Sequence, residues 1–159
     1  MTKNPNHYPF DLQSVLTYRL ARLQAKLNAQ ASDLVDKQGG ISLSQWRVLA
    51  VLSDKNVTTQ KDVLMTVGLD KGQISRTIKQ LVEKQFIAVR HDEPDSRIQH
   101  LTLTEAGIAI TEKLHPIMKA RQNYLKSDFT DKELELLFDW LGRLELKSHK
   151  INFGDDADG

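Results

Sequence analysis

The residues best suited to bind another molecule gather in one basic stretch of the sequence. Between Lys71 and Arg90 five positive side chains stand against the single acid Glu83, so the local charge is five minus one, +4, in a chain of net charge +1. Lysine and arginine bind phosphates and base edges, and such a patch is the electrostatic footprint of a nucleic-acid-binding protein. The count alone fits a solvated surface equally well. The positive residues are Lys71, Arg76, Lys79, Lys84 and Arg90.

Residue spacing places most of this charge on one side of a helix. Ile74, Ile78 and Leu81 recur at helical spacing, and Thr77 lies on their face. A helix with one apolar and one basic face can pack on a core and still fill the major groove of DNA. The outward side carries Gly72, Arg76, Lys79 and Glu83, flanked by Gln73, Ser75 and Gln80.

A helix-turn-helix is predicted around this amphipathic helix. Thr58 or Thr59 caps a shorter helix, and Val67-Gly68-Leu69 forms a tight turn after it. Asp70 and Gln73 then form a capping box, in which each residue satisfies a free backbone N–H of the other. Two capped helices joined by a short turn with glycine are typical of this motif.

The helix before this motif has a capping box of its own. Ser42 and Gln45 begin a helix that runs from Leu43 to about Ser53, and Ile41 is placed to contact Trp46 as a hydrophobic staple. This helix supplies the apolar support for the motif. Its inward-facing residues are Trp46, Leu49, Ala50 and Leu52.

Two strand-like runs follow the basic helix. Phe86–Arg90 and Ile98–Leu103 are joined by a seven-residue turn with Pro94, and this pattern predicts a β-hairpin. Asp95 and Arg97 lie at its tip, where an arginine can enter a narrow minor groove. A helix-turn-helix followed by such a hairpin is a winged helix, which we expect over residues 41–103.

Long helices flank the winged helix on both sides. Leucines recur at threes and fours over residues 11–37, which predicts a helix about 40 Å long that ends at Gly39-Gly40. Thr104 caps the next helix, which Pro116 is expected to kink, and Thr130 with Glu133 begins the last. These helices, over about 104–148, are more apolar than the winged helix can cover. We therefore expect them and residues 11–37 to form a homodimer interface.

Bulk composition favours one soluble domain. The chain has 159 residues, 40% of them apolar, and no cysteine, so neither disulfides nor thiolate metal sites are expected. Neither a signal peptide nor a membrane span is recognisable, and a cytoplasmic protein is the expectation. Residues 1–10 are expected to be a flexible arm and residues 152–159 a disordered tail. The fold class is mainly α with a small β-hairpin.

The chain resembles the MarR family of bacterial winged-helix transcriptional regulators over about Asp11 to Lys147. Asp95-Ser96-Arg97 and Leu101-Thr-Leu-Thr-Glu-Ala-Gly107 are similar to the family's wing signature. Gln45–Leu49 and Thr59-Gln60-Lys61 match weaker family features. The resemblance implies one MarR-like domain over residues 11–151 that acts as an obligate dimer. It also implies a recognition helix in the major groove, a wing arginine in the minor groove, and release by small, often phenolic, anions.

One position departs from the family pattern. A glycine usually precedes the first wing strand, where the helix ends in a left-handed residue, and here it is Gln85. A non-glycine residue adopts that conformation at a cost of about 1 kcal/mol. Either Gln85 carries this strain, or the helix ends differently and the wing is re-aimed.

These patterns assign roles to the polar residues. Arg76 is expected to read a guanine, because a guanidinium bonds to guanine O6 and N7 together. Arg97 is expected in the minor groove, held by Asp95 through a charge-assisted hydrogen bond. The alternative for this pair is an exposed turn ion pair worth under about 1 kcal/mol. Gln73 and Ser75 are expected at bases or phosphates, and the phosphate-contact candidates are Gln60, Lys71, Lys79 and Arg90.

A binding site for a small effector is a further hypothesis. Tyr18 and Arg22 are four residues apart on the first helix, and Trp46 is on the second. An arginine with aromatic neighbours in a cleft suits an aromatic carboxylate. The alternative is that Trp46 belongs to the core while Tyr18 and Arg22 pack in an interface.

Taken together, these patterns favour a homodimeric, ligand-responsive repressor that binds double-stranded DNA at a pseudo-palindromic operator. The competing class is a winged helix used for protein–protein contact without DNA. A small hydrolase is a third class, but no nucleophile–base pair is recognisable. No cofactor is expected. No metal is expected either, because the acids and histidine of residues 91–95 lack the spacing of a metal site.

Overall fold

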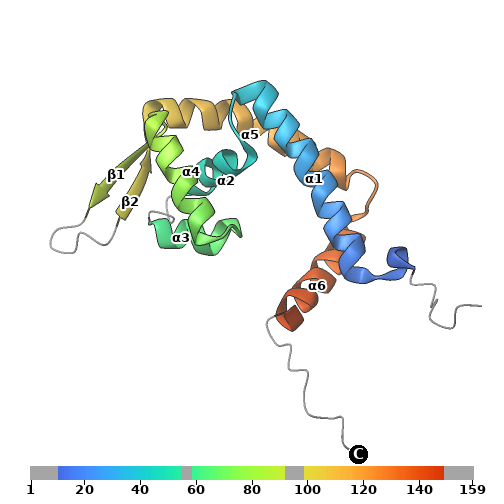
Figure 1. The fold of residues 1–159 in the computed structure, drawn as a ribbon. Helices are drawn as coiled ribbons and strands as arrows, with labels where there is room; N and C mark the ends of the chain where they lie inside the picture. Colours follow the sequence, from blue (N-terminus) through green and yellow to red (C-terminus); the bar gives the residue numbers. More distant parts are fainter. Residues whose placement is uncertain (1–10, 55–58, 92–98, 149–159) are drawn as a thin grey trace, which may run out of the picture. The chain divides into compact units, whose positions relative to one another are not determined.

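The computed structural model describes residues 11–54, 59–91 and 99–148, and it divides into two compact units, Met1–Met118 and Lys119–Gly159. The described chain is mainly helical with one two-stranded antiparallel sheet (Figure 1), which confirms the predicted fold class. Each unit is described by itself. The elements are η1 (Leu12–Ser14), α1 (Leu16–Gly39), α2 (Leu43–Leu52), α3 (Gln60–Val67), α4 (Lys71–Glu83), β1 (Ile87–His91), β2 (Gln99–Leu103), α5 (Glu105–Lys126) and α6 (Asp131–Ser148).

The first helical segment begins with a short 3₁₀ turn before α1. Asp11 caps this turn by accepting a hydrogen bond from the Gln13 backbone N–H at 3.0 Å. The α-helix starts at Leu16, later than predicted, and continues through Gly39, so that Gly39-Gly40 ends it as predicted. Gly40 ends it with φ of 63°, and its N–H donates to the Asp36 carbonyl at 2.8 Å. A left-handed glycine is the expected terminator, because it has no side chain to clash.

Capping residues set the starts of the next two helices. Ser42 and Gln45 form the predicted capping box at α2, with both reciprocal bonds present. Thr59 rather than Thr58 caps α3, also through a capping box, and Asp62 supplies the returning carboxylate. Thr58 itself lies outside the described residues. Local sequence therefore places both helix starts.

Only half of the predicted box at α4 is formed. The Gln73 N–H donates to the Asp70 carboxylate at 2.8 Å, but no bond returns from the Gln73 side chain among the described residues. The box was therefore predicted wrongly in its second bond. The carboxylate of Asp70 satisfies the exposed N-terminal amide by itself, which leaves the Gln73 amide group exposed to solvent.

The end of α4 settles the alternative at Gln85. This residue has φ of 59°, the one left-handed non-glycine residue in the described chain. Its N–H bonds to the Val82 carbonyl at 2.9 Å, and the Phe86 N–H bonds to the Leu81 carbonyl at 2.9 Å. These two bonds are a complete Schellman motif. The helix therefore ends where the family pattern requires, and Gln85 carries the strain.

The hairpin follows directly from this turn, and β1 begins where α4 ends (Figure 1). The two strands pair antiparallel, with Ile87 opposite Leu103 and Val89 opposite Leu101. Ile87 and Leu101 are buried in the core, so one face of the hairpin is anchored. The first strand starts one residue later than predicted, because Phe86 belongs to the helix end.

The start of α5 is packed against the backbone at the end of α4. The Thr104 hydroxyl donates to the Gln85 carbonyl at 2.6 Å, and the Thr104 N–H donates to the Phe86 carbonyl at 3.1 Å. The same hydroxyl accepts from the Gly107 N–H at 3.1 Å. A Cβ atom on Gly107 would lie 2.0 Å from the Phe86 carbonyl oxygen. Glycine is therefore required at position 107 because the two backbones touch.

One apolar core joins the elements of the first unit. Trp46, Leu49 and Leu52 are buried as predicted, whereas Ala50 is only half-buried. Ile41 and Trp46 share this core, in agreement with the predicted staple. The core extends from α1 to Leu114 of α5 and consists of Val35, Ile41, Trp46, Val48, Leu49, Leu52, Val63, Ile74, Ile78, Leu81, Ile87, Leu101 and Leu114.

The second unit contains the end of α5 and all of α6. Thr130 and Glu133 form the predicted capping box, and the hydrogen bonds from the Thr130 backbone and hydroxyl hold the pKa of the Glu133 carboxyl below its ordinary value. One face of α6 carries four leucines at helical spacing, and all four are half-buried: Leu134, Leu137, Leu141 and Leu144. Pro116 lies inside α5, in the first unit, and the kink expected there stays a prediction. Large apolar side chains exposed on α6 are Leu136, Phe138, Trp140 and Leu146.

Gly107→Ala tests the contact between α5 and the end of α4. We expect the free energy of unfolding to fall by about 1–3 kcal/mol or more, since the new methyl group overlaps a backbone carbonyl that cannot rotate away. Urea denaturation measures this loss. The control is Gly142→Ala on α6, where a Cβ meets nothing within 4 Å and should be neutral or stabilising. Equal effects at both positions would contradict the contact.

Gln85→Gly tests the strain at the Schellman turn. Removing the Cβ relieves a left-handed conformation that costs about 1 kcal/mol, so the free energy of unfolding should rise by up to that amount. Gln85→Ala is the matched control, because alanine loses the same amide but keeps the Cβ. Thermal or urea unfolding should rank glycine above alanine, and the reverse order would show that Gln85 is unstrained.

Candidate DNA-binding surface

The polar side chains of α4 point away from the core, as the spacing predicted. Ile74, Thr77, Ile78 and Leu81 are at most 5% exposed. Burying the three aliphatic side chains contributes about 1.5–3 kcal/mol each, which anchors the helix by its inner face. The outer side is free to contact a partner. Its exposed residues are Lys71, Gly72, Gln73, Ser75, Arg76, Lys79, Gln80 and Glu83.

The positive charges of this surface are not neutralised inside the described chain. Among the described residues, no carboxylate forms an ion pair with Lys71, Arg76, Lys79 or Arg90. Two ion pairs of the described chain lie elsewhere, Lys37–Asp33 on α1 and Arg143–Asp139 on α6. Unpaired, exposed cations remain available for phosphate oxygens, whose counterions they displace.

A polar network ties α4 to the corner between α1 and α2. Gln45 is 5% exposed, and its Nε2 donates to the Gln80 Oε1 at 3.1 Å. Its own Oε1 accepts from the Ser42 N–H at 3.1 Å and from the Lys84 Nζ at 3.4 Å. Lys84 also donates to the Gly40 carbonyl at 3.2 Å. These bonds fix the second half of α4 on the corner.

Two residues of this network, Gln45 and Lys84, have structural roles that the sequence patterns did not predict. Gln45 was expected only as a capping residue and Lys84 only as one of five positive charges. The available signal was the position of Gln45 directly before Trp46, inside an apolar helix face. A glutamine there must satisfy its amide with a partner from another element, because unsatisfied buried polar groups are costly.

Two further phosphate-contact candidates lie on either side of β2. Arg90 is exposed on β1 and pairs with His100, and Thr59 forms an isolated bridge to the same His100. Gln60 follows Thr59 as the first residue of α3 and is half-buried. The structure therefore brings the start of α3 next to the hairpin, which adjacency in the sequence did not reveal.

The hairpin tip lies outside the described residues, and with it Asp95, Arg97 and the acids considered as metal ligands. Over residues 11–54, 59–91 and 99–148, no group of three or more His, Cys, Asp or Glu side chains is placed to hold a metal ion. In the same residues, no helix is both long and apolar enough to cross a membrane.

The three effector candidates lie in different surroundings. Tyr18 and Arg22 are exposed on α1, one turn apart. Trp46 is 7% exposed and packs in the core of the first unit. This burial matches the alternative in which Trp46 is a core residue. The effector role of these residues stays a prediction.

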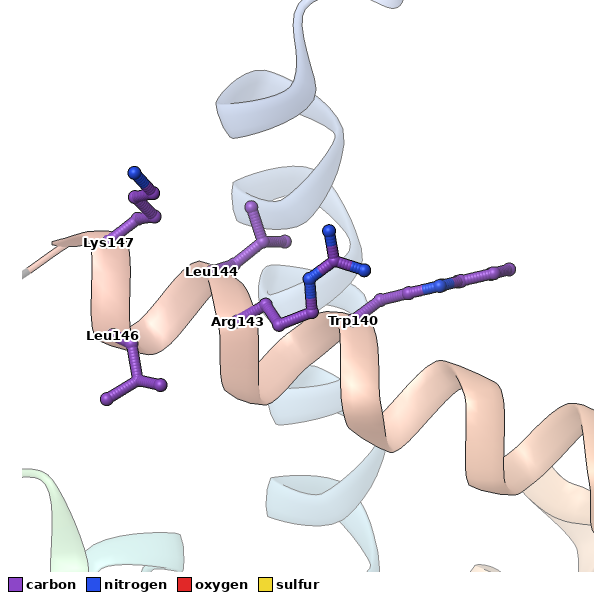
Figure 2. A pocket seen from close by; sticks show the side chains of 5 residues that line it. All are labelled: Trp140, Arg143, Leu144, Leu146 and Lys147. Atoms are coloured by element: carbon purple, nitrogen blue, oxygen red, sulfur yellow. The ribbon is translucent and has the colours of Figure 1, made fainter.

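An apolar recess with two cations lies on α6 instead. It has a volume of about 810 Å³, and Figure 2 shows Leu146 leaving the helix on the side opposite Lys147. Trp140 and Arg143 continue the recess along the helix. The described residues that line it are Trp140, Arg143, Leu144, Leu146 and Lys147.

Comparisons with known proteins agree with this geometry. Residues 39–98 match the sequence model of the MarR family. The chain is 30% identical over 105 residues to the HTH-type transcriptional regulator BilQ of Clostridium symbiosum, which covers 66% of this chain and 73% of that relative.

Solved structures show the same fold over most of the chain. A MarR/EmrR family transcriptional regulator from Acinetobacter sp. ADP1 has a TM-score of 0.78 at 31% identity, covering 84% of this chain and 94% of the other. MepR of S. aureus, in a complex with DNA, has a TM-score of 0.77 at 21% identity, covering 86% and 99%. The chain therefore belongs to the MarR family of transcriptional regulators.

Proposed function

We propose that this chain is a homodimeric repressor that binds a pseudo-palindromic operator in double-stranded DNA. The observation that carries the proposal is the outer face of α4, where exposed cations have no acidic partner among the described residues. A helix held by its apolar face and tied to a corner by Gln45 presents these cations as a rigid unit. Rigid presentation lowers the ordering cost of binding. In MepR, a protein of the same fold, the solved complex contains DNA.

Contacts on this surface divide into base reading and phosphate binding. Arg76, near the middle of α4, reads a guanine edge through its two-pronged guanidinium. Gln73 and Ser75 flank it, and Asp95 with Arg97 extends the contact into the minor groove. Phosphate contacts position the protein without reading sequence, and they come from Gln60, Lys71, Lys79 and Arg90.

Exposed apolar side chains on the flanking helices support the homodimer. Leu12, Leu16 and Leu23 are 47%, 51% and 53% exposed, and Phe138 and Trp140 on α6 are 60% and 53% exposed. Large apolar patches on a soluble protein are aggregation hazards unless a partner covers them. A second copy covers them by symmetry and places two recognition helices about 34 Å apart, one turn of DNA.

Ligand control follows from that spacing. A small aromatic or anionic effector that favours another distance between the two α4 helices shifts the population away from DNA. Tyr18, Arg22 and Trp46 remain the candidates for this site. The protein represses by blocking access to a promoter. Because it acts on promoter DNA, its expected location is the cytoplasm. The proposal includes no enzymatic activity and no cofactor.

Binding of the full chain to fluorescent 30-base-pair duplexes selected from genomic fragments tests the proposal. We expect tight binding. The logarithm of the association constant should fall linearly as the logarithm of the salt concentration rises, because the DNA phosphates release counterions when the protein binds. Sedimentation of the complex should give two chains per duplex. The rival class, a winged helix used only for protein contact, predicts no duplex binding at low salt, and that result would refute the regulator.

Arg76→Ala and Lys79→Ala separate base reading from phosphate binding. Arg76→Ala should cost about 1–3 kcal/mol on the selected duplex and relax preference at one base pair per half-site. Lys79→Ala should weaken selected and random duplexes alike and reduce the salt slope by about one. Fluorescence anisotropy on both duplexes measures the four affinities. Equal losses on both duplexes for Arg76→Ala would exclude it as the base reader.

A further inference from the structure

A small recess lies between the start of α2 and the outer side of α4. Its volume is about 240 Å³, which is large enough for a phosphate group and small for a drug-sized ligand. It opens beside Arg76, the proposed base reader. Nothing in the sequence patterns singled it out, because its two walls are some thirty residues apart. The lining residues are Ser44, Leu69, Gln73, Arg76, Thr77 and Gln80.

The chemistry of this lining favours an anion. Arg76 supplies a guanidinium, Ser44 and Thr77 supply hydroxyls, and Gln73 and Gln80 supply amides. Each of these groups can donate a hydrogen bond, and no carboxylate is among the described residues that line the recess. Charge-assisted hydrogen bonds to an oxyanion are stronger than neutral ones. A cation or an apolar group would leave these donors unused.

Thr77 gives the most direct sign that the recess can hold a hydrogen-bond acceptor. The residue is 5% exposed, and its hydroxyl has no hydrogen-bond partner among the described residues. Buried helical threonines usually donate to the carbonyl one turn back, as Thr111 does to Gly107 at 2.7 Å. Because no fully enclosed polar atom of the described chain lacks a partner, the Thr77 hydroxyl must open into the recess that it lines. The Thr77 side chain is therefore buried apart from its hydroxyl, which faces the recess.

Hydrogen bonding also fixes which end of Gln80 faces outward. The Ser42 backbone N–H can only donate, so the Gln45 atom that it contacts is the oxygen. The Gln45 nitrogen then faces Gln80 and must meet the Gln80 oxygen, as the 3.1 Å bond has it. This leaves the Gln80 NH₂ group, a pure donor, without an acceptor among the described residues. The partly buried network around Gln45 therefore orients Gln80 as a donor at the recess.

We propose that this recess binds a phosphate of the DNA backbone, held by the Thr77 hydroxyl and the Gln80 amide beside Arg76. The inference rests on the proposed function and names a contact within it. A phosphate seated there fixes the height and register of α4 in the groove, while Arg76 at the rim extends to the base. Gln45 is a positioning residue for this contact, because it orients Gln80 without touching DNA.

Thr77→Val removes the hydroxyl while keeping the shape of the side chain. We expect affinity to fall about tenfold on the selected and on the random 30-base-pair duplex alike, the loss of one hydrogen bond to a charged group. The salt slope should not change, since valine and threonine are both neutral. Thr77→Ser should restore binding. Thr111→Val is the control, because it alters an equally buried threonine that does not line the recess.

Gln80→Glu tests the second donor by a different route. Glutamate keeps an oxygen for Gln45 but replaces the outward NH₂ with a charged oxygen, so it should repel phosphate and weaken both duplexes more than Thr77→Val does. Gln85→Glu adds the same charge outside the recess and controls for the change in net charge. Thermal unfolding of each variant checks that the fold is intact.

Single methylphosphonate substitutions along the selected duplex locate the phosphate. Wild-type protein should bind more weakly when a methylphosphonate replaces one particular phosphate in each half-site. For Thr77→Val the same replacement should cause no further loss of affinity, because the contact to that phosphate is already missing. A loss restricted to the selected sequence would show that the recess reads a base, and unchanged binding by Thr77→Val and Gln80→Glu would show that it holds no phosphate. Either result overturns the inference and leaves the regulator intact. Failure of the wild-type protein to bind any duplex would instead refute the proposed function.

Discussion

The backbone at Gln85 and Phe86 is the constraint on which the first unit depends. The Schellman turn ends α4 there, β1 begins at the next residue, and both carbonyls accept hydrogen bonds from Thr104. Gly107 then brings α5 into contact with the same peptide. The ends of α4, β1 and α5 therefore all meet at Gln85 and Phe86. The backbone conformation of these two residues sets the direction of the hairpin relative to α4. The left-handed Gln85 shows that the fold maintains this geometry even without glycine.

A second constraint fixes the outer face of α4. Burial of its apolar face holds α4 on the core. Apolar contacts alone are not directional, so the helix could still slide or rotate slightly. The bonds of Gln45 and Lys84 to Gln80, Ser42 and Gly40 resist this motion, because hydrogen bonds are directional. The exposed cations and donors of α4 therefore occupy defined positions before any partner arrives. Such preorganisation is what a surface that reads DNA requires.

Much of this arrangement could be predicted from local signals. Ser42 and Thr130 were recognised as caps, and Thr59 was one of two candidates, because a short polar side chain before an apolar period can bond to the free N–H groups of a helix start. The face of α4 followed from the spacing of Ile74, Ile78 and Leu81. The second bond of the Asp70 box was predicted wrongly, since an exposed glutamine can bond to water instead. The sequence could not decide whether Trp46 belongs to the core or to a ligand cleft, because a tryptophan suits both, and the structure buries it.

The sequence by itself determined the starts of α2, α4 and α6, the hairpin, the two faces of α4 and the resemblance to a regulator family, since all of these depend on residues within a few turns of one another. Only the tertiary structure decided the conformation of Gln85, the need for glycine at position 107, the orientation of Gln80 and the free hydroxyl of Thr77. The physical reason is that each depends on atoms brought together from distant segments, such as Gln45 and Gln80, 35 residues apart. Composition and periodicity record which side chains are buried, but only the packed chain determines which donor meets which acceptor.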